Sequence, residues 1–346
     1  MIKPKPLKKG DTVAIVSLSS GMGGEPMYRY RYEIAKKRLK ELFGLHVIEM
    51  PHTLSGIAYL NAHPDQRAQD LMDAFEDPSV SAIFCMIGGD DTIRLLPYID
   101  FDVIRKNPKI FMGYSDTTIN HFMMFHAGLV SYHGPCMLVE FAENVKMHDY
   151  TVRSIRRTLF EPEDTLKITS SPEWTSEFLD WGNPKYQAIP RKMHKEIHSY
   201  ELLQGKGVVS GPLIGGCLGV FRMMIGTKIW PTLNEWDGKI LFLETAEDYP
   251  TPEDVCYFLR NLSAQGILER LHGIVVGKPL GERYYNEYKA IYQQVVGVEA
   301  GLSDLPILYN VNCSHNAPCT ILPYGINAQI DCNRPSLTLL EPAVAY

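Results

Sequence analysis

Four short segments of the chain carry residues whose types suit acyl-transfer chemistry. In the first, FMGYSDTT (111–118), an apolar run ends in Gly, Tyr and Ser115 before helix-compatible polar residues. A serine at a sharp strand-to-helix turn is exposed, and the first N–H groups of the helix point at whatever binds there. Ser115 is therefore a candidate nucleophile, and the N–H of Asp116 a candidate oxyanion donor. The pattern also suits a helix N-cap, which local sequence alone favours, because the final glycine of the usual hydrolase elbow is missing.

The second and third segments could supply further parts of such a site. In IGGDDTIRLL (87–96), the glycine pair Gly88 and Gly89 follows an apolar run, so its N–H groups could approach an oxyanion closely; an ordinary tight turn is the alternative. The spacing matches no phosphate-binding glycine motif. In KILFLETAEDYPTPEDV (239–255), Glu244 ends an apolar strand. It could orient a histidine, as the carboxylate of a Ser-His-acid triad does, or simply face solvent.

The fourth segment, VNCSHNAPCTILPYG (311–325), places His315 in a turn-rich link between two strand-like pieces. A loop histidine beside small residues can reach a neighbouring domain and act as general base, although most histidines are surface or core residues. The chain has no H-x-x-x-H or H-E-x-x-H motif, and Cys313 and Cys319 lack a second ligand pair at zinc-finger spacing. We therefore predict no metal and no cofactor.

The elements that must position these residues alternate between strand and helix through about residue 130. This alternation predicts an α/β domain with a doubly wound, mostly parallel sheet, whose site lies beyond the carboxyl ends of the strands. The expected strands are 11–20, 45–51, 80–89 and 107–115, and the expected helices are 27–44, 63–79, 90–100 and 116–128.

The regular alternation of strands and helices ends after a further helix over 150–160, and residues 161–206 show little periodicity. We expect an N-terminal domain over 1–165, a linker or loop over the site at 166–206, and a C-terminal α/β domain with a β-rich core over 207–346. In the last of these, Thr251, Pro252 and Asp254 have the spacing of a helix start, with Thr251 as the N-cap.

The composition limits the partners of the protein. The 346 residues are 45% hydrophobic and 21% charged, with a formal net charge of −6, which argues against a nucleic-acid polymer or an anionic membrane as partner. The N-terminus indicates neither a signal peptide nor a transmembrane segment. Seven scattered cysteines without a C-x-x-C motif suggest reduced thiols and a cytoplasmic location.

Taken in order, the segments resemble the LD-carboxypeptidase family of serine peptidases over most of the chain. The specific marks are GGDDTIRLL, IFMGYSDTT, GPLIGGCLG, ILFLET followed by a helix, GIVVGKP and SHNAPCTILPYG. The resemblance implies a two-domain, metal-free enzyme, usually a cytoplasmic homodimer. It also implies a triad in which Ser115 is the nucleophile, His315 the base and Glu244 the orienting acid. The implied oxyanion hole uses the backbone N–H groups of Gly88, Gly89 and Asp116.

Two branches of this family differ in substrate. One removes the terminal D-alanine from muropeptide tetrapeptides; the other is similar to microcin C self-immunity proteins, which hydrolyse aminoacyl nucleotide amides. The segment EWTSEFLDW (173–181) resembles the second branch, and there Trp174 or Trp181 could stack on a nucleobase or merely pack the linker onto the body. Two positions depart from the family, which often has Asn where Cys217 stands and Gly where Ser314 stands.

We therefore predict a serine carboxypeptidase that cleaves an amide at the C-terminal side of a small peptide, with Arg94 as a candidate for holding the free carboxylate. A microcin immunity-type hydrolase of aminoacyl or peptidyl nucleotide amides is the first alternative. An ordinary α/β-hydrolase esterase would instead carry Glu244 and His315 on the same sheet as Ser115. A non-catalytic small-molecule binding protein is the last alternative.

Overall fold

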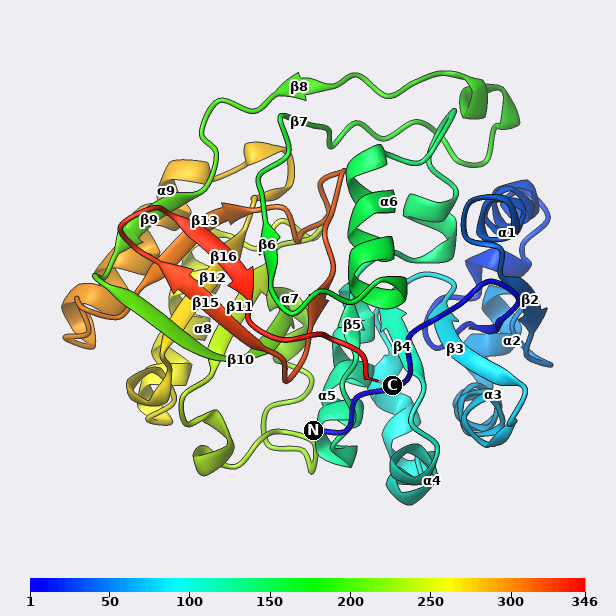
Figure 1. Ribbon diagram of the computed structural model, residues 1–346, viewed down its shortest axis with the longest axis horizontal. Coiled ribbons are helices and arrows are strands. Elements are labelled where there is room, and N and C mark those ends of the chain that lie inside the picture. Colours follow the sequence, from blue (N-terminus) through cyan, green and yellow to red (C-terminus); the bar gives the residue numbers. More distant parts are fainter. Residues whose placement is uncertain (346) are drawn as a thin grey trace.

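Two sheets lie side by side with helices around them (Figure 1). The structure is a computed structural model and describes residues 1–345. The N-terminal sheet has the order β14-β5-β4-β3-β1-β2, and its strands run parallel except for β14, which is antiparallel to β5. This is the predicted doubly wound arrangement. The strands are β1 (Thr12–Val16), β2 (His46–Glu49), β3 (Val80–Cys85), β4 (Ile110–Gly113), β5 (Tyr132–His133) and β14 (Leu322–Pro323).

The helices expected over 27–44, 63–79 and 116–128 are present, whereas two short helices, α2 (Ile57–Ala62) and α4 (Phe101–Lys106), were not predicted. The longest, α1 (Arg29–Phe43), ends at Gly44 in a left-handed conformation with φ of 69°, which glycine adopts without a steric penalty. The expected helix over 90–100 is instead a 3₁₀ stretch, Thr92–Tyr98, with Pro97 inside it. The remaining helices are α2 (Ile57–Ala62), α3 (Pro64–Glu76), α4 (Phe101–Lys106), α5 (Thr118–Ala127) and α6 (Asp149–Ile155).

The C-terminal sheet is mixed and has the order β6-β16-β15-β10-β11-β12-β13-β9. Its centre, β10 to β13, is parallel, and antiparallel strands extend both edges. The strands are β6 (Leu166–Ile168), β9 (Glu201–Gln204), β10 (Val208–Cys217), β11 (Ile240–Glu244), β12 (Gly273–Gly277), β13 (Ile307–Val311), β15 (Asn327–Asp331) and β16 (Ser336–Leu339). The helices are α7 (Leu218–Phe221), α8 (Pro252–Ala264) and α9 (Tyr285–Tyr292).

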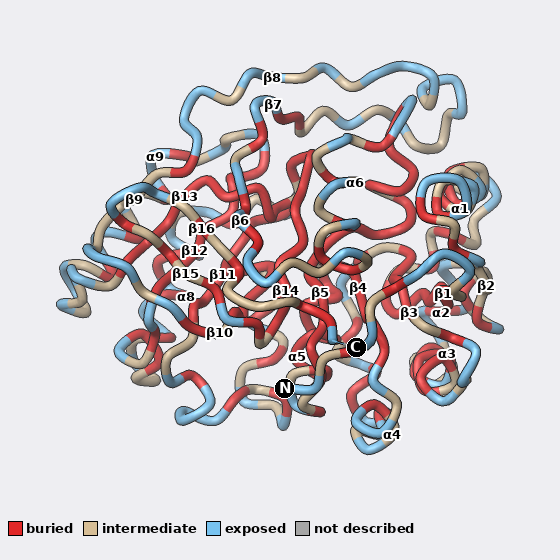
Figure 2. The backbone as a smooth tube through the Cα atoms, viewed as in Figure 1, coloured by how far each residue is buried: buried red, intermediate tan, exposed pale blue. Residues whose placement is uncertain are grey.

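The segment expected as a linker, 166–206, begins and ends with strands of the C-terminal sheet, β6 and β9. Between them a strap, residues 169–200, runs along one edge of the molecule from one half to the other (Figure 1). It contains the short strand pair β7 (Glu173–Trp174) and β8 (His194–Lys195) and a 3₁₀ turn, Pro184–Ala188, and most of it is exposed or intermediate (Figure 2). The strap therefore spans both halves of the protein.

The two halves are interlocked. The strand β14 comes from the C-terminal third of the sequence but pairs with β5 of the N-terminal sheet. Buried residues fill the strands of both sheets and the region between them (Figure 2). The core is consequently continuous from one sheet to the other, which holds the carboxyl ends of the parallel strands of both sheets in a fixed relation.

The start of α8 provides a test of the fold. Thr251 Oγ1 accepts from the N–H of Asp254 at 3.2 Å, and Asp254 accepts from the N–H of Thr251 at 2.7 Å, which is the predicted capping box. We expect Thr251→Ala to lower the free energy of unfolding by about 1 kcal/mol because one helix N–H loses its acceptor. Thr251→Ser keeps the hydroxyl and should match the wild type in urea denaturation; equal losses in both variants would contradict the capping role.

Candidate active site

Ser115 lies at the turn between β4 and α5, where the backbone is strained. Its φ is 62°, in the left-handed region that residues with a side chain rarely adopt. It starts a 3₁₀ turn, Ser115–Thr117, that leads into α5, and it caps neither element: the N-cap residue is Tyr114 for the turn and Thr117 for α5. The N-cap alternative is therefore wrong. Strained turns of this kind cluster at active sites, where they hold a nucleophile exposed.

Glu244 and His315 form a buried pair on the C-terminal sheet. Glu244 is the last residue of β11 and is 1% exposed, and its Oε2 lies 2.7 Å from Nδ1 of His315, in the loop after β13. The intervening strand β12 ends in Gly277, where a Cβ would lie 2.9 Å from the Cβ of Glu244. A glycine is thus needed for the two side chains to approach across β12. Ser314 supports the loop by donating from Oγ to the carbonyl of Lys278 at 2.7 Å.

The electrostatics of the pair favour a charged imidazole. Burial opposes the charged form of His315, but Glu244 first and Glu247 second outweigh it and raise the pKa of His315 to about 9. Burial would raise the pKa of Glu244, but the imidazole of His315 holds it below its ordinary value. Glu247 was not singled out in the sequence. Its Oε2 lies 3.4 Å from Nε2 of His315, and the only sequence signal was its position three residues after Glu244.

Tyr114 brings the serine turn of the N-terminal half into contact with His315 of the C-terminal half. Its ring packs edge-on against the imidazole of His315, with centroids 4.9 Å apart, and it directly precedes Ser115. A second link joins the end of β10 to the start of α5, where the N–H of Cys217 donates to Thr118 Oγ1 at 3.0 Å. Nε2 of His315 has no hydrogen-bond partner within residues 1–345. The structure thus pairs Glu244 with His315 beside the serine turn, and the Ser115–His315 contact stays a prediction.

Cys217 is buried beside the pair. Burial raises the pKa of its thiol well above the ordinary value, and the charge of Glu244 adds to this effect, so Cys217 stays a neutral thiol. Thr118 holds the backbone at this position through the bond to the Cys217 N–H. A polar contact from the side chain, which the family's usual asparagine would offer, is here limited to a weak S–H donor.

The predicted oxyanion residues lie around Ser115. A Cβ on Gly88 would come within 2.7 Å of the Cβ of Ser115 and 3.2 Å of the backbone nitrogen of Asp116, so the glycine turn packs directly on the serine turn. The backbone hydrogen bonds of the described chain include none donated by Gly88 or Gly89. Neither amide is thus committed to a backbone acceptor of the described chain, and their role in an oxyanion hole stays a prediction.

Arg94 is engaged away from the serine turn. Its Nη1 contacts Asp91 Oδ2 at 2.9 Å and the side-chain oxygen of Asn61 at 2.8 Å, and the side chain is 42% exposed. Asp91 also pairs with the fully buried Arg67 at 2.6 Å. Arg94 therefore belongs to an ion-pair network behind the glycine turn, and holding a substrate carboxylate would require it to leave these partners.

The two tryptophans of the strap have different surroundings. Trp174 is 6% exposed, stacks on His194 with centroids 4.8 Å apart, and has the Lys278 ammonium 4.6 Å from its ring. It packs the strap onto the C-terminal half, so stacking on a ligand would require a partner to move. Trp181 is half-buried, with the Arg31 guanidinium 4.5 Å over its ring and the exposed Phe178 beside it. Trp181 is therefore the less enclosed of the two rings, and stacking of either tryptophan on a nucleobase stays a prediction.

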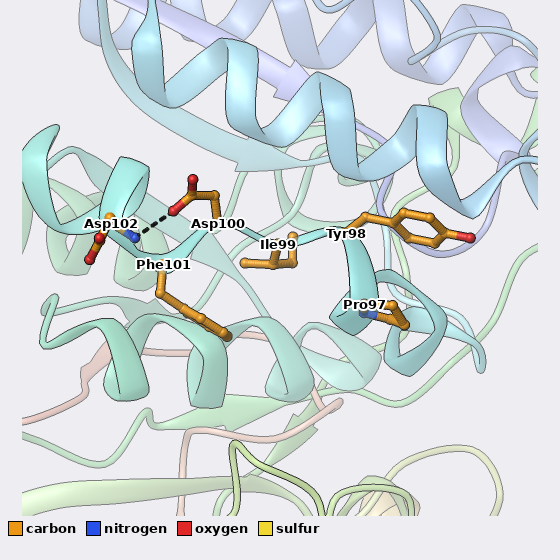
Figure 3. Close-up of a pocket in the computed structure, with 6 residues that line it drawn as sticks. All are labelled: Pro97, Tyr98, Ile99, Asp100, Phe101 and Asp102. Carbon is orange, nitrogen blue, oxygen red and sulfur yellow. Dashed lines mark hydrogen bonds between the residues drawn. The ribbon is translucent and has the colours of Figure 1, made fainter.

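A surface hollow lies at the end of the 3₁₀ stretch that carries Arg94 (Figure 3). It has a volume of about 470 Å³ and is lined by Pro97–Asp102, where the carboxylate of Asp100 caps α4 by accepting from the N–H of Asp102 at 2.8 Å. It contains none of the candidate catalytic side chains, so we assign it no role. Within residues 1–345, no group of three His, Cys, Asp or Glu side chains is arranged to hold a metal, and no helix has the length and apolar character to cross a membrane.

Comparison with known proteins gives consistent matches along the chain. The family models for the LD-carboxypeptidase N-terminal and C-terminal domains match residues 13–134 and 210–330. The microcin C7 self-immunity protein MccF of Escherichia coli is 27% identical, covering 97% of this chain and 95% of the relative. The "Probable murein peptide carboxypeptidase" of Bacillus subtilis is 30% identical, covering 95% of this chain and 91% of the relative.

Solved structures agree with the sequence matches. An MccF-like protein from Streptococcus pneumoniae in complex with AMP superposes with a TM-score of 0.88 at 36% identity, covering 96% of this chain and 99% of the other. MccF itself, in complex with glutamyl sulfamoyl guanosine, has a TM-score of 0.85 at 25% identity and is covered completely. The two-domain fold predicted from the sequence is the fold of these proteins.

The Glu247 contact predicts a measurable pH shift. Because only neutral imidazole can act as a base, activity should rise as the pH approaches about 9, the pKa of His315. Glu247→Gln removes one stabilising negative charge, so we expect the pKa of His315 to fall by roughly half a unit to one unit, a modest shift because the Glu247 side chain is exposed and screened.

The shift can be read by NMR titration of the imidazole nitrogens of His315 and by the acid limb of kcat/KM. Glu253→Gln, which removes an equal charge at the exposed start of α8, serves as the matched control. Superimposable titrations of the wild type and both variants would show that Glu247 does not act on His315.

Proposed function

We infer the reaction from one premise: the chain belongs to the LD-carboxypeptidase family, in the branch similar to MccF. We propose that it is a serine-type hydrolase that cleaves an amide bond of a small acyl or peptidyl substrate. Ser115 is the nucleophile, His315 the general base and Glu244 the residue that orients the imidazole. The observation that carries this proposal is the 2.7 Å contact between buried Glu244 and His315 beside the strained Ser115 turn.

The proposed cycle is acyl transfer. Ser115 Oγ attacks the scissile carbonyl carbon while His315 Nε2 takes its proton, and the resulting oxyanion accepts from the N–H groups of Gly88, Gly89 and Asp116. The imidazolium returns the proton to the leaving amine as the C–N bond breaks. Water then hydrolyses the acyl-enzyme by the same route. Glu244 holds the Nδ1–H tautomer and stabilises the imidazolium, a role supported by the raised pKa of His315.

The first candidate substrate is a muropeptide tetrapeptide, cleaved at its C-terminal amide. Support comes from the 30% identical relative, whose name assigns it to murein peptides. A carboxypeptidase needs a cation or donor for the free carboxylate of its substrate. Arg94 remains our candidate, although its present bonds to Asp91 and Asn61 must be exchanged for it to serve.

The second candidate substrate is an aminoacyl or peptidyl nucleotide amide. It is favoured by the 36% identical structure that holds AMP and by the MccF complex with glutamyl sulfamoyl guanosine. The half-buried ring of Trp181, with Phe178 next to it, offers a π-face for a nucleobase. We place the nucleobase there in this alternative.

The esterase alternative fails on topology. It required Glu244 and His315 on the sheet that carries Ser115, whereas both lie at the ends of strands of the C-terminal sheet and Ser115 follows β4 of the N-terminal sheet. The remaining alternative is a non-catalytic binding protein, and the next experiment tests it.

A fluorophosphonate probe tests the nucleophile whichever of the two substrates is correct. We expect one equivalent of label on Ser115 and none on Ser115→Ala, because Ser314, the serine next to His315, is buried and donates its hydroxyl to the carbonyl of Lys278. Ser115→Ala should also abolish turnover while retaining ligand affinity. Turnover that survives Ser115→Ala would refute the triad, and a folded wild type that takes no label would favour the binding protein.

A side-by-side assay decides between the two substrates. The same enzyme preparation is given a muropeptide tetrapeptide and a glutamyl sulfamoyl adenosine, and release of D-alanine or of the amino acid is followed by mass spectrometry. If the nucleotide amide is the substrate, Trp181→Ala should raise KM by roughly 10-fold or more through the loss of base stacking, worth about 1–3 kcal/mol. Trp181→Phe should retain part of the affinity, and an unchanged KM in Trp181→Ala would exclude the stacking site.

A further inference from the structure

The side chain of Asp116, the residue after the candidate nucleophile, is completely buried and has an unusual set of partners. Its Oδ2 accepts from Ser19 Oγ at 2.7 Å and from the N–H of Thr92 at 2.9 Å, and its exposed fraction is 0%. Its Oδ1 has no hydrogen-bond partner within the described chain. A carboxylate in this setting costs free energy unless it is well paired, so its hydrogen bonds call for a functional explanation.

The partners of Asp116 come from the ends of three neighbouring strands. Ser19 follows β1, Thr92 follows the glycine turn after β3, and Asp116 follows β4. These strands are adjacent in the N-terminal sheet. One carboxylate oxygen therefore joins the three loops in which the candidate catalytic backbone lies.

Ser19 links Asp116 to the glycine turn, Gly88–Gly89, by packing against it. A Cβ on Gly89 would lie 2.2 Å from Ser19 Oγ, so the hydroxyl that donates to Asp116 packs directly against Gly89. The N–H of the next residue, Ser20, donates to the carbonyl of Gly88 at 3.1 Å. Because the C=O and N–H of a trans peptide unit point in opposite directions, this bond turns the N–H of Gly89 away from the Ser20 loop.

The other side of the same turn contacts the nucleophile. Gly88 packs on the Cβ of Ser115 and on the backbone nitrogen of Asp116. A shift of the turn by about 1 Å would misplace oxyanion donors enough to cost on the order of 100-fold in rate. The turn is therefore held between Ser19 and Ser115, and Asp116 contacts both sides of it.

We propose that the carboxylate of Asp116 is a positioning residue, which fixes the Gly88–Gly89 turn relative to Ser115 by binding Ser19 and the N–H of Thr92. This rests on the proposed function, since it assigns the turn to the oxyanion hole. The role requires an acceptor oxygen at Oδ2 and does not require the negative charge. An asparagine can supply the same acceptor, whereas an alanine cannot.

The test compares Asp116→Ala, Asp116→Asn and Ser19→Ala with the wild type. We expect Asp116→Ala and Ser19→Ala to lower kcat by about 10- to 100-fold with KM within about threefold, because oxyanion stabilisation acts on the transition state and not on ground-state binding. Asp116→Asn should restore kcat to within about threefold of the wild type. Fluorophosphonate labelling of Ser115 should slow in the same order.

Asp70 provides the matched control for loss of a buried carboxylate. It is 2% exposed on α3 and accepts from the N–H of His52 at 2.9 Å. Asp70→Ala should lower the urea midpoint while kcat and labelling stay at wild-type values. If Asp116→Ala does not fold by circular dichroism, Ser19→Ala carries the comparison, because it leaves the carboxylate and its Thr92 bond in place.

Two failures are distinguishable. A wild type that labels on Ser115, with folded Asp116→Ala or Ser19→Ala labelling equally fast, would overturn the positioning role and leave the proposed function intact. Equal loss of kcat in Asp116→Asn and Asp116→Ala would also overturn it, since the charge would then be the essential property. A folded wild type with neither label nor turnover would refute the proposed function itself.

Discussion

The hydrogen bond between Glu244 and His315 is the interaction on which the rest of the site depends. Glu244 is 1% exposed, so its carboxylate is costly without a partner, and the His315 side chain that pairs with it is 10% exposed. Their contact demands that β11, β12 and β13 lie in parallel register with a glycine at the end of β12. The pair in turn fixes the ring that packs on Tyr114, and through it the position of the base beside the serine turn.

The interlocked domains explain how the proposed nucleophile on one sheet could work with the proposed base on the other. β14 returns from the C-terminal part of the chain to pair with β5, and the strap binds both halves, with Thr175 bridged to Ala317 in the histidine loop and the carbonyl of Trp181 accepting from Tyr30 on α1. Relative motion of the halves is thereby restricted, which preorganises the carboxyl ends of both sheets. Within the N-terminal half, the buried carboxylate of Asp116 joins the three loops after β1, β3 and β4.

Much of the fold was predictable because its signals are local. Apolar β-branched runs and helical periodicity located β1, β3, β4, α1 and α3 to within a few residues, and Gly44 and Thr251 marked helix ends through backbone geometry and capping. The 3₁₀ stretch over Thr92–Tyr98 and the edge strands β6 and β9 were missed, since short elements with weak periodicity are decided by the neighbours they pair with. The N-cap alternative for Ser115 was wrong because the left-handed φ of this residue leaves no sequence signal apart from the family motif.

The sequence by itself determined the family: six motifs in order resemble the LD-carboxypeptidases, and the family models match residues 13–134 and 210–330. From this resemblance we predict an acyl-transfer site at Ser115, Glu244 and His315. Only the tertiary structure decided which groups meet. Strand order, loop path and burial decide these contacts. They are Glu247 with His315, Asp116 with Ser19, Arg94 with Asp91 and Lys278 with Trp174. The Glu247 contact helps to raise the pKa of His315, and the Ser19 hydroxyl bound to Asp116 packs against Gly89, because charge and hydrogen-bond effects act over a few ångströms in space and not along the chain.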